Sequence, residues 1–525
     1  MLATLLLAAT ISQHALKAHV DFLSSDLLEG RETATRGYDV AAQYVSSQLE
    51  SFGVQPAGDD GTWLQTVRFR TYKLEPAQSS FCIGSGAECL PFEHRKDVLI
   101  QSNPNPSSAL DAEVVFVGFG ITAPELQHDD YANVDVRGKT VAYLSGAPPI
   151  FPHSQRAHYS AGSYKWETAV AHGAIGVLTV RTSESERRFN WERTISGADA
   201  AAMRALDRRG NPFEVYPQLR GGATLGPNAS AALFRGEELE LPQILADAEQ
   251  GRARTFPLKK RVSIRTTTTL GEATSPNVVG IIRGSALPNE HVVLSAHLDH
   301  LGMAASGTDR IRNGALDNAS GIAALLEIAR SIASMKTRPK RSIVFLAVTA
   351  EEKGTMGSLA FADHPSVEGE IVANVNMDML TMLFPVKSLV ALGIEHSSLG
   401  PMARQAATRA GFTLQPDPLP EEVRFIRSDQ FSFVMQGIPA ITYKGGLESL
   451  DPTIDGDKLT REWLRTVYHS VRDERTQAIH YESGVRWAIA NRELVLMIAN
   501  AAQRPAWNEG DFFGKTFGRV RKEKE

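Results

Sequence analysis

The sequence predicts an α/β fold: a mixed, largely parallel sheet with helices on both faces, interrupted by a β-rich insert. After residue 275, short apolar segments typical of buried strands alternate with helical segments. This alternation is typical of parallel sheets that helices cover. Between about residues 70 and 268, short strand-like pieces are instead separated by glycine, proline and serine, which predicts a second, β-rich unit.

The chain is long enough for two domains, since its 525 residues exceed what one hydrophobic core usually supports. We assign residues 14–69 and 269–510 to one discontinuous main domain and residues 70–268 to the insert. The last residues, 511–525, are rich in charge and are expected to form a solvated tail. The main domain is therefore formed by two segments of the chain, one before and one after the insert.

The first residues, 1–13, are expected to be a signal peptide. The run MLATLLLAAT is apolar, ends in small residues and is too short to span a bilayer. The alternative is that this run is the buried end of a helix. A signal peptide predicts an exported protein, periplasmic or secreted. No later apolar run is long enough to predict a membrane span.

The composition limits the classes of partner and of metal site. The net charge of −5 and the pI of about 6.3 give no basic surface for nucleic acid. Only two cysteines occur, Cys82 and Cys89, so any metal must be held by histidine nitrogens and carboxylate oxygens. In an exported protein these cysteines can pair as a disulfide, and two free thiols are the alternative.

The expected elements follow the chain in order. Near the N-terminus, helical periodicity predicts helices over 14–28 and 38–52. In the insert we expect a helix over 163–173 and strands over 113–121, 139–146 and 174–180. In the main domain we expect strands over 277–284, 291–297, 342–352 and 371–380, and helices over 321–334, 401–411 and 482–502.

The most informative stretch, residues 295–321, joins a strand, a polar loop and a helix. His297 and Asp299 end the strand, and because side chains alternate across a strand the two share one face. Asp317 lies at the end of the loop, before an alanine- and leucine-rich helix. Open α/β sheets bind ligands at the carboxyl ends of their strands, so these residues are candidates for a site. A surface loop that merely carries them is the alternative.

Acidic and imidazole residues also follow the later strands. Glu351 and Glu352 end one strand, Asp378 ends the next, and His469 follows a polar segment. Two histidines and three carboxylates suit two divalent ions that share one carboxylate. The candidate metal ligands are His297, Asp317, Glu352, Asp378 and His469. Each residue alone is more often structural, but the apolar strands that lead to them argue against a solvated face.

Two other classes of enzyme find no support in the sequence. No G-x-S-x-G motif occurs, which argues against a serine hydrolase. No phosphate-binding Walker loop occurs, which argues against a nucleotide enzyme. A metal-dependent enzyme and a non-catalytic binding protein therefore stay as the two main readings.

Five segments resemble the motifs of the co-catalytic zinc exopeptidases, the family of bacterial leucyl aminopeptidases, glutamate carboxypeptidase and the transferrin receptor. They are SAHLDHLG, GALDNASG, TAEEKGTMGS, NVNMDM and YHSVRDE. The segment of about residues 105–185 also resembles the protease-associated domain inserted in many members. The resemblance implies the zinc exopeptidase fold for the main domain and a peptide substrate.

The resemblance also implies a role for each motif residue. Asp317 would bridge two Zn²⁺ ions; His297 and Asp378 would complete one site, and Glu352 and His469 the other. In the bridging motif, Leu316 and Asn318 stand where many members have further acidic residues, which removes no ligand.

Three further residues receive roles from the same resemblance. Glu351 would be the general base, and Asp299 would orient the His297 imidazole. Tyr443 would donate a hydrogen bond to the tetrahedral intermediate, with a tyrosine packed in the core as the alternative.

The implied activity is that of an aminopeptidase. A dipeptidase or a carboxypeptidase would share the site, and a glutaminyl cyclase would use a single zinc on the same fold. A receptor-like binding protein is the non-catalytic alternative. The sequence leaves open the residue specificity, the terminus that is read and the oligomeric state.

Overall fold

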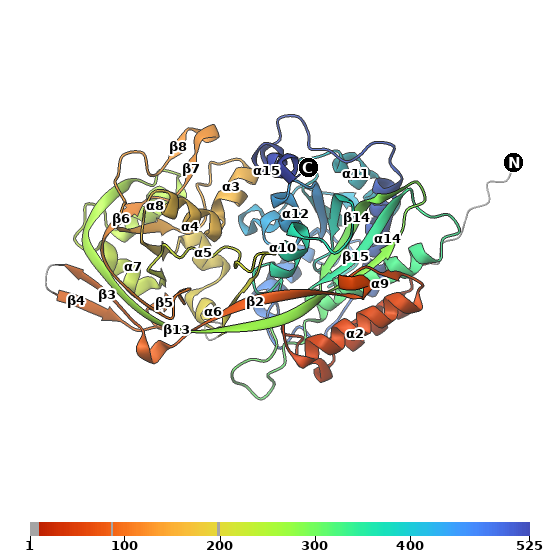
Figure 1. Cartoon of the computed structure of the whole chain (residues 1–525), viewed down its shortest axis with the longest axis horizontal. Helices are drawn as coiled ribbons and strands as arrows, with labels where there is room; N and C mark the ends of the chain where they lie inside the picture. Colours follow the sequence, from red (N-terminus) through yellow and green to blue (C-terminus); the bar gives the residue numbers. More distant parts are fainter. Residues whose placement is uncertain (1–9, 86–87, 197–199, 525) are drawn as a thin grey trace.

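The computed structural model describes residues 10–85, 88–196 and 200–524. Figure 1 shows two lobes, the main domain and the insert, joined by a pair of long strands. Most of the predicted signal peptide, residues 1–9, lies outside the described residues. No helix in the described part of the chain is both long and apolar enough to cross a membrane.

The main domain contains a mixed sheet with the order β2-β13-β15-β14-β16-β19-β17-β18. Its central strands β15, β14, β16 and β19 are parallel. β13 runs antiparallel to β15 and β2, whereas β17 runs antiparallel to β19 and parallel to β18. The bounds are β2 Leu64–Leu74, β13 Thr255–Ile282, β14 Leu287–His297, β15 Arg341–Val348, β16 Glu370–Asn376, β17 Ser388–Leu392, β18 Thr413–Leu414 and β19 Ala440–Gly445. The short strand β1, Gln55–Pro56, also pairs with β13.

Helices cover both faces of this sheet, as predicted. One face packs against α1 Gln13–Leu23, α2 Arg36–Ser51, α9 Ser320–Ala333, α11 Leu399–Arg409, α13 Gly456–Thr466 and α14 Tyr481–Asn500. The other face packs against α10 Met356–Asp363, α12 Gln430–Met435 and α15 Phe512–Lys524. The central strands are apolar because both of their faces are buried; every residue of β15 is buried.

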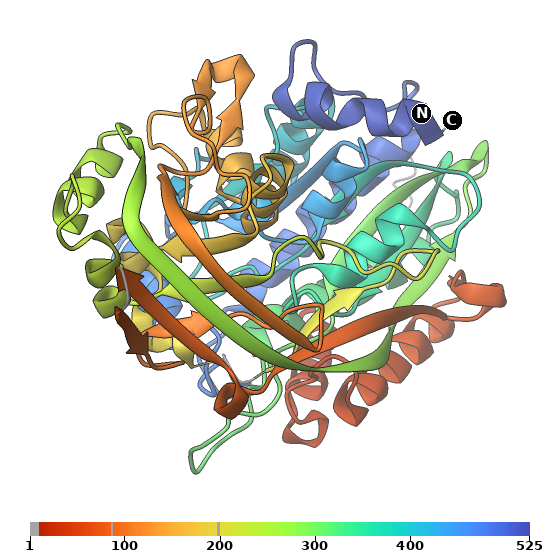
Figure 2. The same cartoon turned by 60° about the vertical axis from the view of Figure 1, so that its left-hand side comes forward.

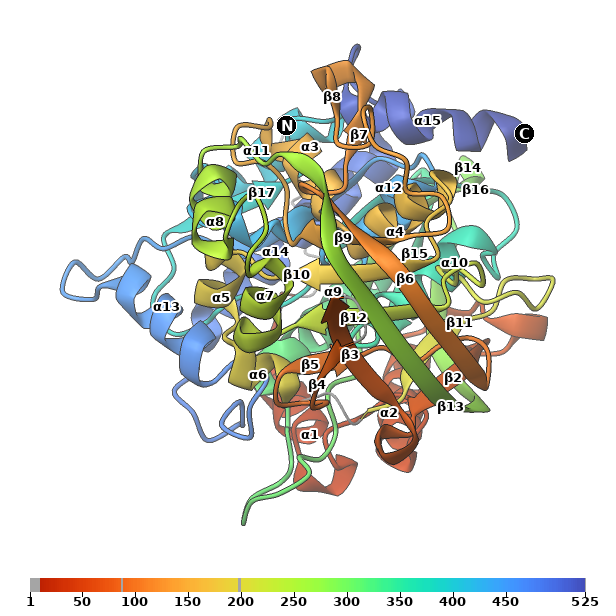
Figure 3. The ribbon, with the colours of Figure 1, turned by 90° about the vertical axis from the view of Figure 1, so that its left-hand side faces the viewer.

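The insert has its own sheet, with the order β4-β3-β13-β6-β9-β10-β12-β5. Figure 3 views the molecule from this side. The strands are β3 Ser80–Ser85, β4 Glu88–Phe92, β5 Val98–Ile100, β6 Ser107–Val117, β9 Thr140–Leu144, β10 Gly176–Val180 and β12 Gly221–Leu225, with the small hairpin β7 Thr122–Ala123 and β8 His128–Asp129 beside them. The helices are α3 His153–Ser160, α4 Gly162–Ala171, α5 Ser183–Arg188, α6 Trp191–Ile195, α7 Pro227–Phe234 and α8 Leu241–Glu249.

One continuous strand links the two lobes. β13 contains 28 residues and pairs first with β6 and β3 in the insert, then with β2 and β15 in the main domain (Figure 2). A further strand, β11 Ala202–Ala205, pairs with β2. The predicted limits at residues 69/70 and 268/269 therefore fall inside strands rather than in linkers.

The predicted tail is a helix, which corrects the expectation of a solvated end. In α15, Phe513 is fully buried and contacts Phe425 and Phe431 of the main domain. Phe512 and Phe517 also reach His158 of the insert. The aromatic residues hold this segment in place although it is rich in charge.

Cys82 and Cys89 form a disulfide across the β3–β4 hairpin. Of the two alternatives for these cysteines, the structure therefore supports the pair.

Candidate metal centre

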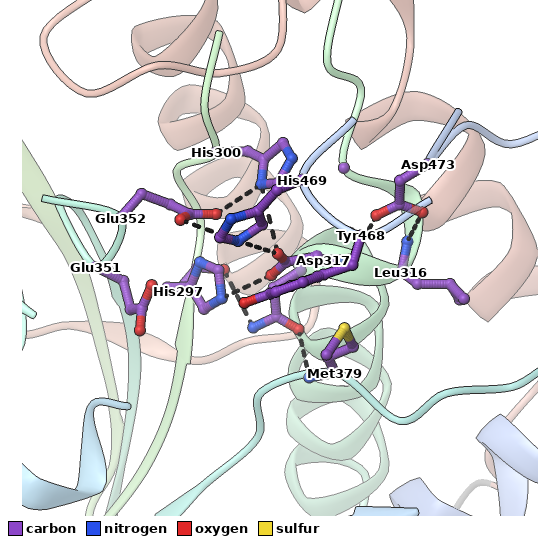
Figure 4. Close-up of polar contacts among 12 residues, drawn as sticks. His297, His300, Leu316, Asp317, Glu351, Glu352, Met379, Tyr468, His469 and Asp473 are labelled. Carbon is purple, nitrogen blue, oxygen red and sulfur yellow. Dashed lines mark hydrogen bonds and ion pairs between the residues drawn. The ribbon is translucent and has the colours of Figure 1, made fainter. Parts of the chain in front are cut away.

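The candidate ligands converge because adjacent parallel strands end at one edge of the sheet. β14 ends at His297, β15 leads into Glu352, and β16 leads into Asp378. Asp317 lies in the turn Ala315–Ala319 that precedes α9. Figure 4 shows His297, Asp317 and Glu352 directed towards one another, with His469 reaching in from the loop after α13.

The distances divide the candidate ligands into two groups that share Asp317. His297 Nε2 lies 3.3 Å from Asp317 Oδ1 and 3.6 Å from Asp378 Oδ1. His469 Nε2 lies 3.1 Å from Asp317 Oδ2 and 3.3 Å from Glu352 Oε2. Each oxygen of Asp317 thus faces one group, as a bridging ligand requires. All five residues predicted as ligands are brought together.

The donor atoms fit divalent cations. Asp317 Oδ2 and Glu352 Oε1 are buried, and imidazole nitrogens of His469 and His300 approach them to 3.1 and 2.8 Å. Buried carboxylates need a compensating charge, which a cation held by the same atoms would supply. Potential ligand atoms of His297, Asp317 and Asp378 lie within 4.8 Å of one another. Nitrogen and carboxylate donors in this arrangement suit zinc.

The pKa shifts reflect the same crowding of charge. Burial alone would lower the pKa of His297, but Glu351 and the carboxylates of Asp317 and Asp378 raise it well above its usual range. Burial would raise the pKa of Asp317, but the imidazoles of His297 and His469 hold it well below its usual range. The imidazoles and carboxylates therefore lie close enough to shift one another's pKa, a crowding of charge that bound cations would relieve.

Glu351 lies beside this group without belonging to it. Its side chain is half-buried, and burial raises its pKa well above the usual value for a glutamate. A cation at the neighbouring ligands would oppose that shift. Glu351 is therefore placed to exchange a proton with a group held at the metal centre.

Asp299 differs in detail from the prediction. His297 Nδ1 is 3.1 Å from the backbone carbonyl of Asp299 and 4.0 Å from its carboxylate. The carboxylate instead accepts the backbone N–H groups of Glu351 and Glu352, at 3.0 and 3.2 Å, and the hydroxyl of Thr33 at 3.1 Å. Asp299 therefore orients the imidazole through its backbone and positions the two glutamates through its side chain.

His300 is a site residue that the prediction omitted. It is fully buried, and its Nδ1 lies 2.8 Å from Glu352 Oε1 and 3.8 Å from Asp317 Oδ2. Donor atoms of these three residues lie close enough together to hold a metal ion. The signal was present in the motif SAHLDHLG, whose second histidine was not assigned a role.

Tyr443 is not at the site, so its predicted role is wrong. It is fully buried in the core, and its hydroxyl donates to the carbonyl of Ala403 in α11 at 2.5 Å. The tyrosine beside the ligands is Tyr468, whose ring lies 3.8 Å from that of His469 at an interplanar angle of 31°. Its position directly before His469 in YHSVRDE was the available signal.

Two polar side chains hold the turn that carries Asp317. The carboxylate of Asp473 accepts the backbone N–H groups of Leu316 and Asp317, both at 3.0 Å. The amide of Asn318 donates to the carbonyl of Met377 at 3.0 Å and accepts the N–H of Met379, also at 3.0 Å. An amide at position 318 can both donate and accept, so it ties the turn to the segment that contains Asp378.

Arg31, which lies between α1 and α2, is buried beneath the site. Its guanidinium donates to the carbonyls of Leu298, Asn313 and Gly314, at 3.0, 2.5 and 3.0 Å. Burial lowers its pKa to about 10, a value at which the group is still charged at neutral pH. Arg31 thus fixes the strand end after His297 to the loop that leads to Asp317.

A pocket of about 770 Å³ opens beside the metal centre. Asp378 and Tyr468 of the main domain line it, and so do Phe189 and Arg193 of the insert. Arg193 also donates to the carbonyl of Tyr468 at 2.8 Å. The insert therefore forms part of the pocket wall and contacts the loop that carries His469.

Comparisons with known proteins agree with this site. Residues 277–495 match the model of peptidase family M28. Aminopeptidase NAALADL1 of Mus musculus is 34% identical over 131 residues, which cover 24% of this chain and 16% of that protein. Aminopeptidase YwaD of Bacillus subtilis is 28% identical over 228 residues, 42% of this chain and 43% of that protein. The chain thus matches less than half the length of these curated relatives.

The fold is shared with a solved structure over nearly the whole chain. An aminopeptidase from Aneurinibacillus sp. strain AM-1 aligns with a TM-score of 0.55 and 19% identity, covering 96% of each chain. This likeness shows the fold, and the ligands lie within the segment that matches the family model. Residues 277–495, which match the model of peptidase family M28, contain all five candidate ligands of the metal centre.

Proposed function

We propose that this chain is a zinc-dependent aminopeptidase that binds two Zn²⁺ ions and removes N-terminal residues from peptides. The observation that carries the proposal is the position of Asp317, whose two oxygens each face a separate group of ligands. One group contains His297 and Asp378, and the other contains Glu352 and His469.

We assign each side chain around this centre a different role in hydrolysis. Bound zinc would polarise the scissile carbonyl and lower the pKa of the attacking water. Glu351 accepts the proton of that water and passes it to the leaving amine. The hydroxyl of Tyr468, whose ring lies 3.8 Å from that of His469, is proposed as the donor to the oxyanion. Asp299 keeps Glu351 and Glu352 in place through their backbone N–H groups.

The other activities have less support. Two ligand groups favour two ions over the single zinc of a glutaminyl cyclase. The presence of all five ligands together with Glu351 favours catalysis over a receptor-like role. The curated relatives described above are named aminopeptidases, which supports reading of the amino terminus rather than the carboxyl terminus.

The test is hydrolysis of a neutral aminoacyl substrate such as leucine p-nitroanilide. We expect turnover that chelation abolishes and zinc restores, and elemental analysis that gives about two zinc ions per chain for the described ligand set. Full activity after complete removal of transition metals would overturn the proposal. A zinc ratio near one would support the single-zinc alternative instead.

Export and the identity of the insert are part of the same proposal. The Cys82–Cys89 disulfide supports a periplasmic or secreted location, because disulfides persist in oxidising compartments. The β-rich sheet of the insert is in keeping with a protease-associated domain. Fractionation of cells that express the full chain, with a probe of the disulfide, tests the location.

A further inference from the structure

Three arginines surround one phenylalanine in the pocket beside the metal centre. Arg188 and Arg193 come from the insert and Arg427 comes from the main domain. Their guanidinium carbons lie 5.3, 4.8 and 5.7 Å from the centre of the Phe189 ring. We call these three arginines the arginine cluster. It is assembled only where the two lobes meet.

Among the described residues, Glu422 is the one carboxylate that forms ion pairs with the arginine cluster; Glu184 of the same pocket pairs with Arg156, and Glu421 also lines the pocket. Glu422 Oε2 lies 2.9 Å from Arg427 and 3.6 Å from Arg188, so one carboxylate serves two guanidinium groups. Arg193 forms no ion pair among the described residues and donates to the carbonyls of Leu464 and Tyr468. Like charges held together in a half-buried pocket are unfavourable without a counter-ion.

The burial of Arg188 also indicates that its positive charge is incompletely compensated. Arg188 has 28% of its side chain exposed, and its Nε is buried without a hydrogen-bond partner among the described residues. Burial and the neighbouring charge of Arg427 lower the pKa of Arg188. This Nε faces Glu422 Oε2 at 3.6 Å, beyond hydrogen-bond distance, so the ion pair leaves the donor unsatisfied, while the partly exposed Arg188 side chain lines the pocket.

The arginine cluster lies beside the reacting centre. The guanidinium carbon of Arg193 is 5.8 Å from the centre of the Tyr468 ring, which stacks on the ligand His469. A fourth cation of the same pocket, Lys444, lies 2.9 Å from Oδ2 of the ligand Asp378. A group bound by the arginine cluster would therefore belong to a residue next to the scissile bond.

We propose that the arginine cluster binds a carboxylate of the substrate, so that the enzyme prefers peptides with a carboxylate on a residue that flanks the scissile bond. This inference rests on the proposed peptidase function. Guanidinium groups bind carboxylates through paired N–H···O bonds, and arginine is the residue suited to that geometry. The carboxylate has two sources, the side chain of aspartate or glutamate and the free C-terminus of a dipeptide.

The experiment compares matched substrates on the zinc-loaded full chain. One arm measures kcat/KM for glutamate and glutamine p-nitroanilides, which differ only in the charge of the side chain. The other arm measures kcat/KM for the dipeptide Leu-Leu and for Leu-Leu amide, which differ in the C-terminal carboxylate. A preference of about tenfold or more for the charged member of either pair supports the proposal and identifies the source. No preference in either pair overturns it.

Arginine variants then test whether the arginine cluster causes the preference for the charged substrate. Arg188→Gln and Arg427→Gln should each lower kcat/KM for the preferred charged substrate by about 10-fold to 100-fold while hardly changing it for the neutral partner. The neutral substrate thus reports on folding and on the metal centre within each variant. Arg137→Gln, which removes an exposed arginine from the insert, is the matched control and should change neither value. Variants that keep the full preference would overturn the assignment.

Failure of the proposed function is distinguishable from failure of this inference. A chain that hydrolyses the neutral substrates without any charge preference keeps the proposed function and loses the arginine-cluster inference. A chain that hydrolyses none of the substrates loses the proposed function, and the pocket is then tested by calorimetric titration with glutarate and with glutaramide. Binding of glutarate alone, weakened in Arg188→Gln, would support carboxylate binding; equal behaviour of the two probes would overturn it.

Discussion

The carboxylate of Asp473 accepts the backbone N–H of Asp317 at 3.0 Å, although 156 residues separate the two in the sequence. The same carboxylate accepts the N–H of Leu316 and lies four residues after the ligand His469. One loop therefore carries the candidate ligand His469 and also positions Asp317, the proposed bridging ligand. Supporting hydrogen bonds of this kind usually set the affinity of a metal site.

Asp473→Asn is expected to weaken both the fold and the metal centre. An amide offers one oxygen where the carboxylate offers two, so one buried N–H loses its acceptor, at a cost of about 1–3 kcal/mol. Zinc affinity should fall about 10-fold to 100-fold. Urea unfolding and titration with a competing chelator measure the two effects. The control is Asp60→Asn at an exposed position; parental affinity and stability in Asp473→Asn would contradict the expectation.

Glu351→Gln is expected to retain zinc and to lose turnover. The side chain is not among the ligand groups, yet it lies beside them, and glutamine cannot accept a proton from water. Loss of a general base typically lowers the rate by about 10²–10⁴-fold. Elemental analysis and kcat are measured on the same preparation, with the exposed Glu448→Gln as control. Parental kcat would show that Glu351 is not the base.

The proximity of the five candidate ligands was predictable from the sequence, but the direction in which Tyr443 points was not. Successive apolar strands that end in acidic or imidazole residues predict a shared edge, and the structure brings those residues together. On β19, Lys444 points towards Asp378, so its neighbour Tyr443 must point to the opposite face and into the core. The order of residues in that segment does not reveal whether Tyr443 or Lys444 points towards the site.

The order of strands and helices in the fold was predictable from the sequence, but the limits between the main domain and the insert were not. The alternation of strands and helices predicted the sheet, whereas the domain limits were drawn where the composition changes. β13 passes through that change because one strand can pair in two sheets, which local composition does not report. In the terminal segment, Phe513 and Phe517 contact aromatic residues that are distant in sequence. The prediction of a solvated tail was wrong because it rested on the charge of this segment and not on these contacts.

Tyr468→Phe is expected to lower kcat while leaving KM nearly unchanged. The change keeps the ring on His469 and removes the hydroxyl proposed to bind the oxyanion. Loss of one such donor costs about 2.7–4 kcal/mol in the transition state. Tyr443→Phe is the matched control, since its hydroxyl binds Ala403 in the core and its loss should affect stability only. The reverse pattern would restore the original assignment.

His300→Phe is expected to weaken zinc binding at the group that contains Glu352. The phenyl ring keeps the volume but removes the nitrogen that lies 2.8 Å from Glu352 Oε1. We expect the affinity for one of the two ions to fall about 10-fold to 100-fold in a chelator titration. His291→Phe is the control, because it removes a buried histidine of β14 whose ring bonds the carbonyl of Glu368 and not the metal centre. Equal affinities in the two variants would exclude a role for His300 at the metal centre.

The stability of the insert is expected to rise with pH because of Lys165. This lysine is buried, donates to the carbonyls of Phe119 and Leu144, and has its pKa lowered to about 7 by burial. The unfolded chain binds the proton up to about pH 10, so between about pH 7 and pH 10 it holds more protons than the folded chain. Unfolding then becomes less favourable as the pH rises, by at most about 1.4 kcal/mol per pH unit.

Lys165→Met tests this dependence in thermal or urea unfolding at pH 7, 8 and 9. The variant should lose the rise in stability that the parent chain shows over this range, because methionine carries no proton to release. The control is Lys139→Met, which removes a partly exposed lysine of the same lobe and should keep the parental rise. An unchanged pH dependence in Lys165→Met would mean that Lys165 stays charged in the folded insert, held by the two carbonyls and by the nearby charge of Asp130.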